Sequence, residues 1–346
     1  MKKAVIVFLC VLFFSVPVSA EEITAPVVPD TAQEYMPVDT GDFGEALLYV
    51  IKSAVQVIQP ELTAAGRVCL SMICGVLLVS ILKGLPGKQI RVTEFVGTLA
   101  ISALMLHQTN SLVRLGTETV TKLSEYGKLL LPVMTAALAS QGGTTSSAAL
   151  YAGTAVFDAV LCSAISKILI PMVYLYLALS IANSAAGEEA LKKLRDLMKW
   201  LMTWILKIIL YVFTGYMAIT GVISGSADAA AVKAAKLTIS GMIPVVGSIL
   251  SDASEAVLVG AEVMKNTVGV YGVLAILAVW LAPFLQIGVH YLLLKATAAV
   301  CGVFGVQHMS ELISDFSGAM GFLLAMTGAV CFLLLISTVC FMKGVG

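Results

Sequence analysis

The sequence predicts an all-α, polytopic integral membrane protein with about six to eight transmembrane helices plus amphipathic interfacial helices. Three observations lead to this fold class. Hydrophobic residues make up 59% of the 346 residues and charged residues only 12%, which is about half the charged share of a soluble domain. The mean hydropathy is +0.98. Long apolar runs recur along the chain, and a bilayer supplies the apolar solvent that such surface needs.

Composition and motifs argue against several classes of function. Lys plus Arg and Asp plus Glu number 21 each, so no basic excess is left for a nucleic-acid partner. The chain has no CxxC pair and its three histidines are scattered, so we expect no metal site, no cofactor and no disulfide framework. It also lacks G-x-S-x-G and HExxH motifs and paired catalytic aspartates. We therefore do not expect an enzyme.

Residues 1–20 have the pattern of a cleavable signal peptide. Met1-Lys2-Lys3 is a short positive region, an apolar run follows, and Val18-Ser19-Ala20 fits the small-x-small rule of signal peptidase. We predict cleavage after Ala20. An uncleaved anchor is less favoured, because the apolar region is short for a span of about 20 residues.

Residues 21–66 form an extracytoplasmic segment in this interpretation. Up to residue 44 the chain is acidic, contains proline and has little to bury, so we expect it to be flexible. Beyond it, apolar residues recur at helical spacing until Pro60. They are Leu47, Leu48, Ile51, Val55 and Ile58. An amphipathic helix on the outer membrane face explains this pattern, and a plain packing helix explains it almost as well.

Residues 67–346 form the multi-spanning membrane domain. Apolar runs suitable for spans lie near 68–82, 92–108, 148–166, 168–184, 200–223, 267–287, 289–305 and 318–342. A shorter apolar run, 129–139, contains Pro132. It is too short to cross about 30 Å as a straight helix, so it is re-entrant or interfacial in this interpretation.

Basic residues predict the orientation, because they resist translocation. We place three basic groups in the cytoplasm, with the mature N-terminus outside. The groups are Lys83, Lys88 and Arg91; Lys192, Lys193, Arg195 and Lys199; and Lys343. If 148–166 and 168–184 are both full spans, this orientation needs a further crossing around 129–140. Otherwise 148–184 crosses only once, and both arrangements stay open.

The segment 187–199 is predicted to be a cytoplasmic amphipathic helix at the interface. Its apolar stripe consists of Leu191, Leu194, Leu197 and Met198. Docking on the membrane is favoured over binding to a cytoplasmic partner such as an ATPase.

The stretch 225–262 is rich in small residues and carries most of the candidate site residues. Rows of small residues let helix backbones approach closely in a membrane. The charged residues are Asp228, Lys233 and Lys236, followed after Pro244 by Asp252, Glu255 and Glu262. The last three fall within one narrow angular sector of a helix. A solvated acidic edge at the outer interface is favoured over a polar lining for a water-filled path.

Asp158 is an isolated carboxylate within an apolar run. Such a residue usually has a partner or faces a wet cavity. Lys167 and Lys207 are candidate partners, although both can snorkel to the interface. A structural hydrogen bond between helices is at least as well supported as a role in transport.

An extended segment of the sequence resembles a known protein family. The residues FTGYMAITGVISGSADAAAVKAAKLTISGMIPVVGSILSDASEAVL, 213–258, and KNTVGVYGVLAI, from Lys265, together with the signal peptide and acidic segment, resemble the stage III sporulation protein AE family. The resemblance covers essentially the whole mature chain. It offers no catalytic residues to carry over.

The resemblance implies a membrane component of a transenvelope channel or secretion-like complex that links mother cell and forespore and is required for forespore development after engulfment. The implied partners are membrane lipids, other proteins of the stage III sporulation A operon, including a secretion-type ATPase, and the stage II sporulation protein Q complex. The implied location is the mother-cell membrane around the forespore. A stand-alone secondary transporter or permease for a small solute is the alternative, but no inverted repeat is evident in the sequence.

Overall fold

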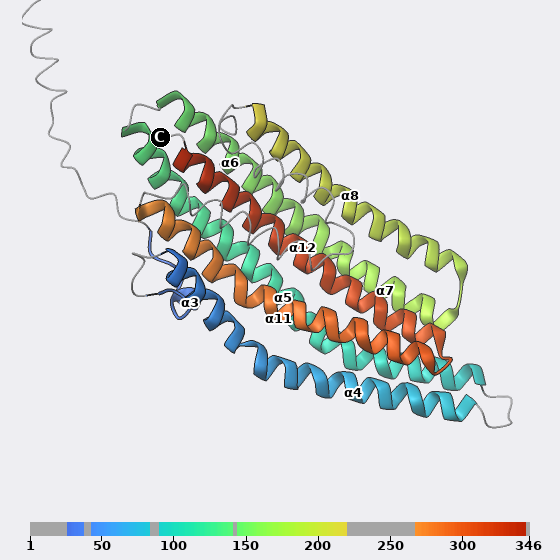
Figure 1. Ribbon diagram of the computed structural model, residues 1–346. Helices are drawn as coiled ribbons and strands as arrows, with labels where there is room; N and C mark the ends of the chain where they lie inside the picture. Colours follow the sequence, from blue (N-terminus) through green and yellow to red (C-terminus); the bar gives the residue numbers. More distant parts are fainter. Residues whose placement is uncertain (1–25, 38–42, 84–89, 141–143, 220–266, 344–346) are drawn as a thin grey trace, which may run out of the picture.

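The structure is a computed structural model that describes residues 26–37, 43–83, 90–140, 144–219 and 267–343, and their long helices pack antiparallel into one bundle (Figure 1). The described part of the chain contains no β-strand. In chain order the elements are α2 (Asp30–Gln33), α3 (Phe43–Gln56), α4 (Ile58–Lys83), α5 (Ile90–Ser140), α6 (Thr144–Ala164), the π-helix η1 (Ile165–Leu169), α7 (Ile170–Ala186), α8 (Glu189–Ile219), α11 (Thr267–Val303) and α12 (Gln307–Lys343). This confirms the predicted all-α fold.

Five helical segments of the described residues are long and apolar enough to cross a membrane. They are Phe43–Lys83, Leu150–Ala186, Glu189–Met217, Val268–Val303 and Gln307–Met342. The helix α5 runs along the same bundle but is more polar, and with it six helical passes lie side by side (Figure 1). The bundle is therefore that of a polytopic membrane protein.

The helices α11 and α12 form the centre of the bundle. In their most apolar stretches 78% of the residues are buried, compared with 22–33% in the other three candidate spans. The two helices pack along each other and contact α5 as well. The tight turn between them, residues 304–306, contains Gly305 at a φ of +75°, a left-handed conformation that glycine adopts without steric cost.

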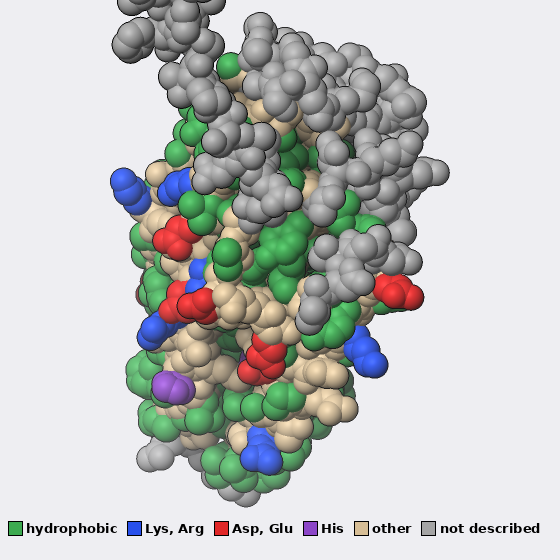
Figure 2. All heavy atoms as spheres, turned by 90° about the vertical axis from the view of Figure 1, so that its left-hand side faces the viewer, with side chains coloured by type: hydrophobic (Ala, Val, Ile, Leu, Met, Phe, Trp, Pro, Cys, Tyr) green, Lys and Arg blue, Asp and Glu red, His purple; other side chains and the backbone are tan. Residues whose placement is uncertain are grey.

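The outer helices turn large apolar side chains away from the bundle. Exposed examples are Leu70, Leu78 and Ile81 on α4, Val156 and Val160 on α6, and Ile208 and Val212 on α8. On the face shown in Figure 2, hydrophobic side chains form broad areas between a few acidic and basic groups. Lipid tails are the solvent that makes such a surface favourable.

The helix α5 joins two segments that the sequence analysis had separated. The predicted span at 92–108 and the short apolar run at 129–139 are parts of one helix of 51 residues, with Pro132 inside it. The run 129–139 is therefore not re-entrant but forms the last turns of this helix. The error arose because the polar stretch between the two runs lowers the average hydropathy, although one of its faces is packed in the bundle.

Residues 144–186 likewise form one continuous helical pass rather than two spans. The elements α6, η1 and α7 follow one another without a turn. The π-helical turn lies directly before Pro171, and such widened turns accommodate an interrupted hydrogen-bond ladder. Of the two topologies left open, the structure has the one in which 148–184 crosses once.

The acidic N-terminal segment is docked where it is described. Val28 and Ala32 are buried, Tyr35 and Met36 pack against the core, and α2 contacts α11. The expected flexibility therefore does not hold for residues 26–37, because a few apolar side chains fix this segment to the bundle. The predicted signal peptide, residues 1–20, lies outside the described residues.

The predicted amphipathic helix is α3. Its small buried residues face the bundle, where α3 contacts α11, and they are Ala46, Val50 and Ala54. Leu48, Ile51 and Val55 are exposed, so α3 packs and also presents an apolar edge. The helix ends before Pro60 rather than at it. Pro60 lies in the first turn of α4, where its missing N–H is not needed.

The turn around Gly187 ends α7 and begins α8. Gly187 has a φ of +71°, and its N–H donates to the carbonyl of Asn183 at 2.8 Å, which is the usual cap of a helix C-terminus. The predicted separate helix at 187–199 is instead the start of α8. Its apolar stripe is not its buried side, since Leu194 and Leu197 are exposed whereas Arg195 is buried.

Two of the three basic groups lie at the same end of the bundle, which we call the Gly187 end (Figure 1). Lys83 ends α4 and α5 begins shortly afterwards, while Lys192 and Lys193 lie in the first turns of α8. Lys343 ends α12, which starts at the Gly187 end and runs to the opposite one. The prediction that all three groups share one side is therefore wrong for Lys343.

Candidate functional site

The helix α5 presents a continuous polar face on the outside of the bundle. Seven exposed polar residues recur alternately at four and three positions along the helix, and we call them the α5 polar face. They are His107, Ser111, Arg114, Glu118, Thr121, Glu125 and Lys128. This spacing keeps them on one side of a helix. From the first residue to the last, the face is about 32 Å long at about 1.5 Å per residue, which is close to the thickness of a hydrocarbon core.

Contacts of the opposite side of α5 place this face at membrane depth. Gly116 lies against Ile287 of α11 and Leu323 of α12, and Gly127 lies against Leu334. These neighbours belong to long uncharged stretches, since 28 residues of α11 precede Lys295 without Asp, Glu, Lys or Arg. Such a stretch is about 42 Å long and spans the hydrocarbon. The polar face therefore lies level with the apolar middle of the bundle.

The charged residues of the α5 polar face are poorly suited to contact with lipid. The Arg114 and Glu118 side chains are 82% and 45% exposed and form an i,i+4 pair with an Nε–Oε1 distance of 2.6 Å. A charged side chain at the bilayer centre costs about 3 kcal/mol. Four such residues on the face would cost on the order of 10 kcal/mol in lipid. Water or another protein surface is the environment that suits this face.

Asp158 lies on α6 behind this face. It is buried, and its Oδ2 accepts a hydrogen bond of 2.6 Å from the Ser124 hydroxyl of α5. The Cys162 thiol lies 3.6 Å from Oδ1. Its hydrogen-bond partners are thus Ser124 and Cys162 rather than the predicted Lys167 or Lys207. The Ser124 contact is a helix–helix hydrogen bond that holds α5 against α6.

The other predicted site residues lie outside the described residues. They are Asp228, Lys233, Lys236, Asp252, Glu255 and Glu262. Their proposed roles, as a solvated edge or as part of a polar path, remain predictions.

A second polar site, the Arg195 cluster, joins α7, α8 and α12 near the Gly187 end. Arg195 Nη1 donates to Asp315 Oδ2 at 2.7 Å, and its Nε and Nη2 donate to Asp196 Oδ1 at 3.1 and 2.9 Å. The Tyr176 hydroxyl donates to Asp315 Oδ1 at 3.0 Å. Both Asp315 oxygens therefore have partners, as a largely buried carboxylate requires.

Serine hydroxyls fix the same end of the bundle. Ser80 of α4 donates to the carbonyl of Phe304 at 2.8 Å, and Ser310 donates to the carbonyl of Ala298 at 2.7 Å. Ser184 of α7 donates to the carbonyl of His308. These bonds join α4 and α7 to the α11–α12 hairpin near its turn and join α12 to α11.

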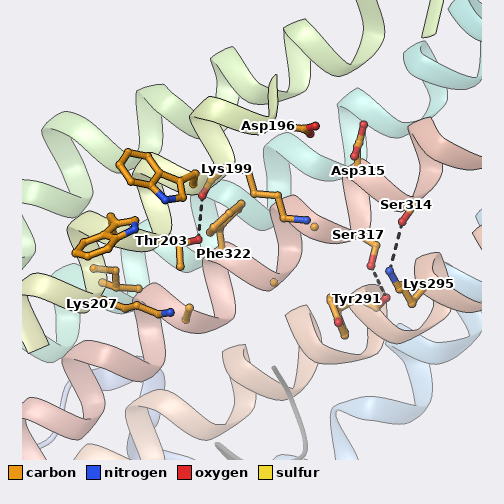
Figure 3. A pocket seen from close by; sticks show the side chains of 16 residues that line it. Asp196, Lys199, Thr203, Lys207, Tyr291, Lys295, Ser314, Asp315, Ser317 and Phe322 are labelled. Carbon is orange, nitrogen blue, oxygen red and sulfur yellow. Dashed lines mark hydrogen bonds between the residues drawn. The ribbon is translucent and has the colours of Figure 1, made fainter. Parts of the chain in front are cut away.

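A pocket of about 450 Å³ opens beside the Arg195 cluster, between α8, α11 and α12. We call it the lysine pocket, because Lys199, Lys207 and Lys295 line it (Figure 3). Trp200 and Trp204 belong to the same wall, and their ring centroids are 5.7 Å apart. The arrangement suits a ligand with an anionic part and an apolar part.

A buried histidine is fully engaged in a structural role. His290 of α11 donates from Nδ1 to the carbonyl of Gln286 at 2.9 Å, and its Nε2 lies 2.8 Å from the Gln108 amide nitrogen of α5. With the ring neutral, Nε2 accepts from this amide. Among the described residues, no group of three or more His, Cys, Asp or Glu is placed to hold a metal ion.

The α5 polar face and the lysine pocket were not predicted from the sequence. The face has a signal in the sequence, the alternating spacing of four and three from His107 to Lys128. The pocket combines Lys199 with Lys295 and Asp315, which are far apart in the chain and come together only when α8 packs beside α11 and α12.

The chain is similar to proteins of one family. The sequence model described as Stage III sporulation protein AE matches residues 23–344. The stage III sporulation protein AE of Bacillus subtilis (strain 168) is 24% identical over 245 residues, which are 69% of this chain and 61% of that protein. The alignment thus spans about three-fifths of the relative's length. No solved structure matches. The chain therefore belongs to the stage III sporulation protein AE family and has a role in sporulation.

Proposed function

We propose that this chain is the polytopic membrane component of a transenvelope channel or secretion-like complex that links mother cell and forespore. In this function it resides in the mother-cell membrane around the forespore and is required for forespore development after engulfment. The family membership and the membrane-type helical bundle support the proposal. Catalysis is no part of it.

The α5 polar face is the observation that carries the proposal. It runs for about the thickness of the hydrocarbon core at about 1.5 Å per residue, and its charged residues are exposed at membrane depth. Charged residues at such depth usually face a water-filled cavity or one another. A hydrated route along α5 gives this face the environment that it needs.

The position of the face favours a component of a complex over a stand-alone transporter. The α11–α12 centre is filled by packed apolar side chains, among them Phe284, Phe316 and Leu324, so the described residues place no polar route there. The polar face lies instead on the outer surface of the bundle. A hydrated route along that surface needs a second wall that the described residues do not form, and in this proposal another protein chain supplies it.

The proposed suppliers of that wall and of energy are other proteins of the stage III sporulation A operon, including a secretion-type ATPase. The stage II sporulation protein Q complex is proposed to continue the route on the forespore side. Affinity purification of the tagged chain from sporulating cells tests these associations. Recovery of none of these proteins would contradict the proposed complex.

Cysteine accessibility tests the hydrated route directly. Single cysteines replace Ser111, Thr121 or Glu125 in a Cys74→Ser parent, because Cys74 carries the exposed thiol among the described cysteines. Val156→Cys and Val160→Cys are the controls, because both valines are exposed on α6 and flank Asp158, which bonds to α5. The controls thus sit at the same depth but on an apolar surface.

A charged, membrane-impermeant thiol reagent is then applied to membranes from sporulating cells. The proposal predicts labelling at the three α5 positions and little at the two valine positions. Equal labelling at all five positions, or none on α5, would contradict a hydrated route. Solute transport by the purified chain alone in liposomes would instead favour a stand-alone transporter.

A further inference from the structure

The lysine pocket has an excess of positive charge. The two carboxylates that line it, Asp196 and Asp315, both form ion pairs with Arg195. The ammonium groups of Lys199, Lys207 and Lys295 take part in none of the ion pairs of the described residues; Lys295 lies 3.4 Å from the Ser314 hydroxyl. Among the residues that the structure describes, these three cations therefore face the pocket without a neutralising acid of their own.

The pocket lies where the apolar part of the bundle ends. Lys295 is the first charged residue of α11, and the uncharged stretch of α12 begins directly after Asp315. Lys199 lies on the neighbouring helix and lines the same pocket. Lys207 is eight residues further along α8, about 12 Å deeper, and a lysine at such a position extends its ammonium group back toward the interface. The pocket is thus level with lipid headgroups.

Aromatic and apolar groups complete the walls. Trp200 and Trp204 are 55% and 47% exposed, and tryptophan favours the headgroup region because its ring is apolar and its N–H is polar. Phe322 and Ala325 line the part of the pocket that lies along the apolar stretch of α12. One side of the pocket is therefore cationic and the other accommodates hydrocarbon.

We propose that the lysine pocket binds an anionic phospholipid. The phosphate lies among the ammonium groups of Lys199, Lys207 and Lys295, and an acyl chain descends past Phe322 between α8 and α12. A zwitterionic choline headgroup is disfavoured, because its own cation meets three lysines. The cavity of about 450 Å³ lies within the usual range of small-molecule sites, about 300–1,000 Å³. This inference depends on membrane insertion and does not rest on the proposed channel complex.

Tryptophan fluorescence provides a local test. The chain has three tryptophans; Trp200 and Trp204 line the pocket, whereas Trp280 is 1% exposed in the core. The full chain is reconstituted into vesicles that contain a rising fraction of brominated phosphatidylglycerol or, separately, of brominated phosphatidylcholine. Bromine quenches tryptophan on contact, so quenching reports lipid at the pocket.

The proposal predicts half-maximal quenching at a lower fraction of the anionic lipid than of the zwitterionic one. Lys199→Gln with Lys295→Gln should weaken this preference by roughly fivefold for each lysine removed. Lys192→Gln with Lys193→Gln is the matched control, because it removes two charges at the same end from exposed residues that do not line the pocket. The control should keep the preference.

Three results would overturn the inference. The two brominated lipids quench equally in the unaltered chain, or the preference survives in the Lys199/Lys295 variant, or the control loses it to the same extent. A fourth concerns the source of the phosphate. If inorganic phosphate abolishes the preference, while sodium chloride of equal ionic strength does not, the pocket binds a free anion and the assignment to a lipid is wrong.

Discussion

Removing the buried partner of Arg195 should strongly destabilise the protein. The side chains of Arg195 and Asp315 are only 9% and 15% exposed, and Asp315 also accepts the Tyr176 hydroxyl. Asp315→Ala leaves a buried guanidinium without this partner, which typically costs about 3–5 kcal/mol. At about 2–4 °C for each kcal/mol, we expect the Tm to fall on the order of 10 °C.

Buried native cysteines supply the assay. Cys301, Cys331 and Cys340 are buried and react with a fluorogenic thiol dye when the detergent-solubilised chain unfolds on heating. Asp196→Ala is the matched control, since Asp196 binds the same Arg195 but its side chain is 56% exposed. An exposed ion pair contributes about 0–1 kcal/mol, so the control should lose at most about 4 °C.

Equal decreases in Tm for Asp315→Ala and Asp196→Ala would refute the assignment of Asp315 as the buried partner. A second variant tests the reason for the cost. Arg195→Met combined with Asp315→Ala removes the buried charge that has lost Asp315 and should recover at least half of the lost Tm, because a neutral replacement of a buried pair is tolerated. If the double variant is no more stable than Asp315→Ala, the buried guanidinium is not the cause of the loss.

The remaining predictions concern packing and the buried carboxylate. Gly153→Ala should cost about 1–3 kcal/mol in the same thermal assay, because an added Cβ would overlap the Tyr216 ring, whereas Gly288→Ala, with open space around it, should be neutral or stabilising. No difference between the two would contradict the described packing of α6 on α8. Ser124→Ala should cost about 1–3 kcal/mol, because Asp158 loses its donor. If Asp158→Asn keeps Tm but abolishes sporulation, Asp158 acts in the route rather than in packing.

The central helices were largely predictable from the sequence, whereas α5 was not. The stretches of α11 and α12 are apolar all round, so their hydropathy alone predicts burial in a membrane protein. In α5 the buried residues Leu112, Val120 and Leu123 alternate with the exposed polar ones. A hydropathy average over a sequence window combines both faces, so this part of α5 resembles a polar loop. The periodic spacing of the exposed polar residues indicates a helix, but the average hydropathy does not show it.

Contacts between residues that are far apart in the chain could not be predicted from the sequence. Asp315 lies 120 positions from Arg195, and no local pattern connects them. Charge counting also placed Lys343 on the wrong side, because a single lysine after a span is a weak signal and because the apolar runs 267–287 and 289–305 were each counted as a span. Both runs belong to the single helix α11, so α12 starts at the Gly187 end and carries Lys343 to the opposite end.

The deep burial of α11 and α12 has a consequence for biogenesis. Ribosomes deliver α3 to α8 to the membrane first, yet these helices surround a centre that is synthesised after them. Until the final hairpin arrives, the early helices lack their main packing surface and need lipid, each other or a chaperone to cover it. The helices that are synthesised last are thus the most deeply buried ones. A nascent chain interrupted before Thr267 lacks the two helices that form the centre of the bundle.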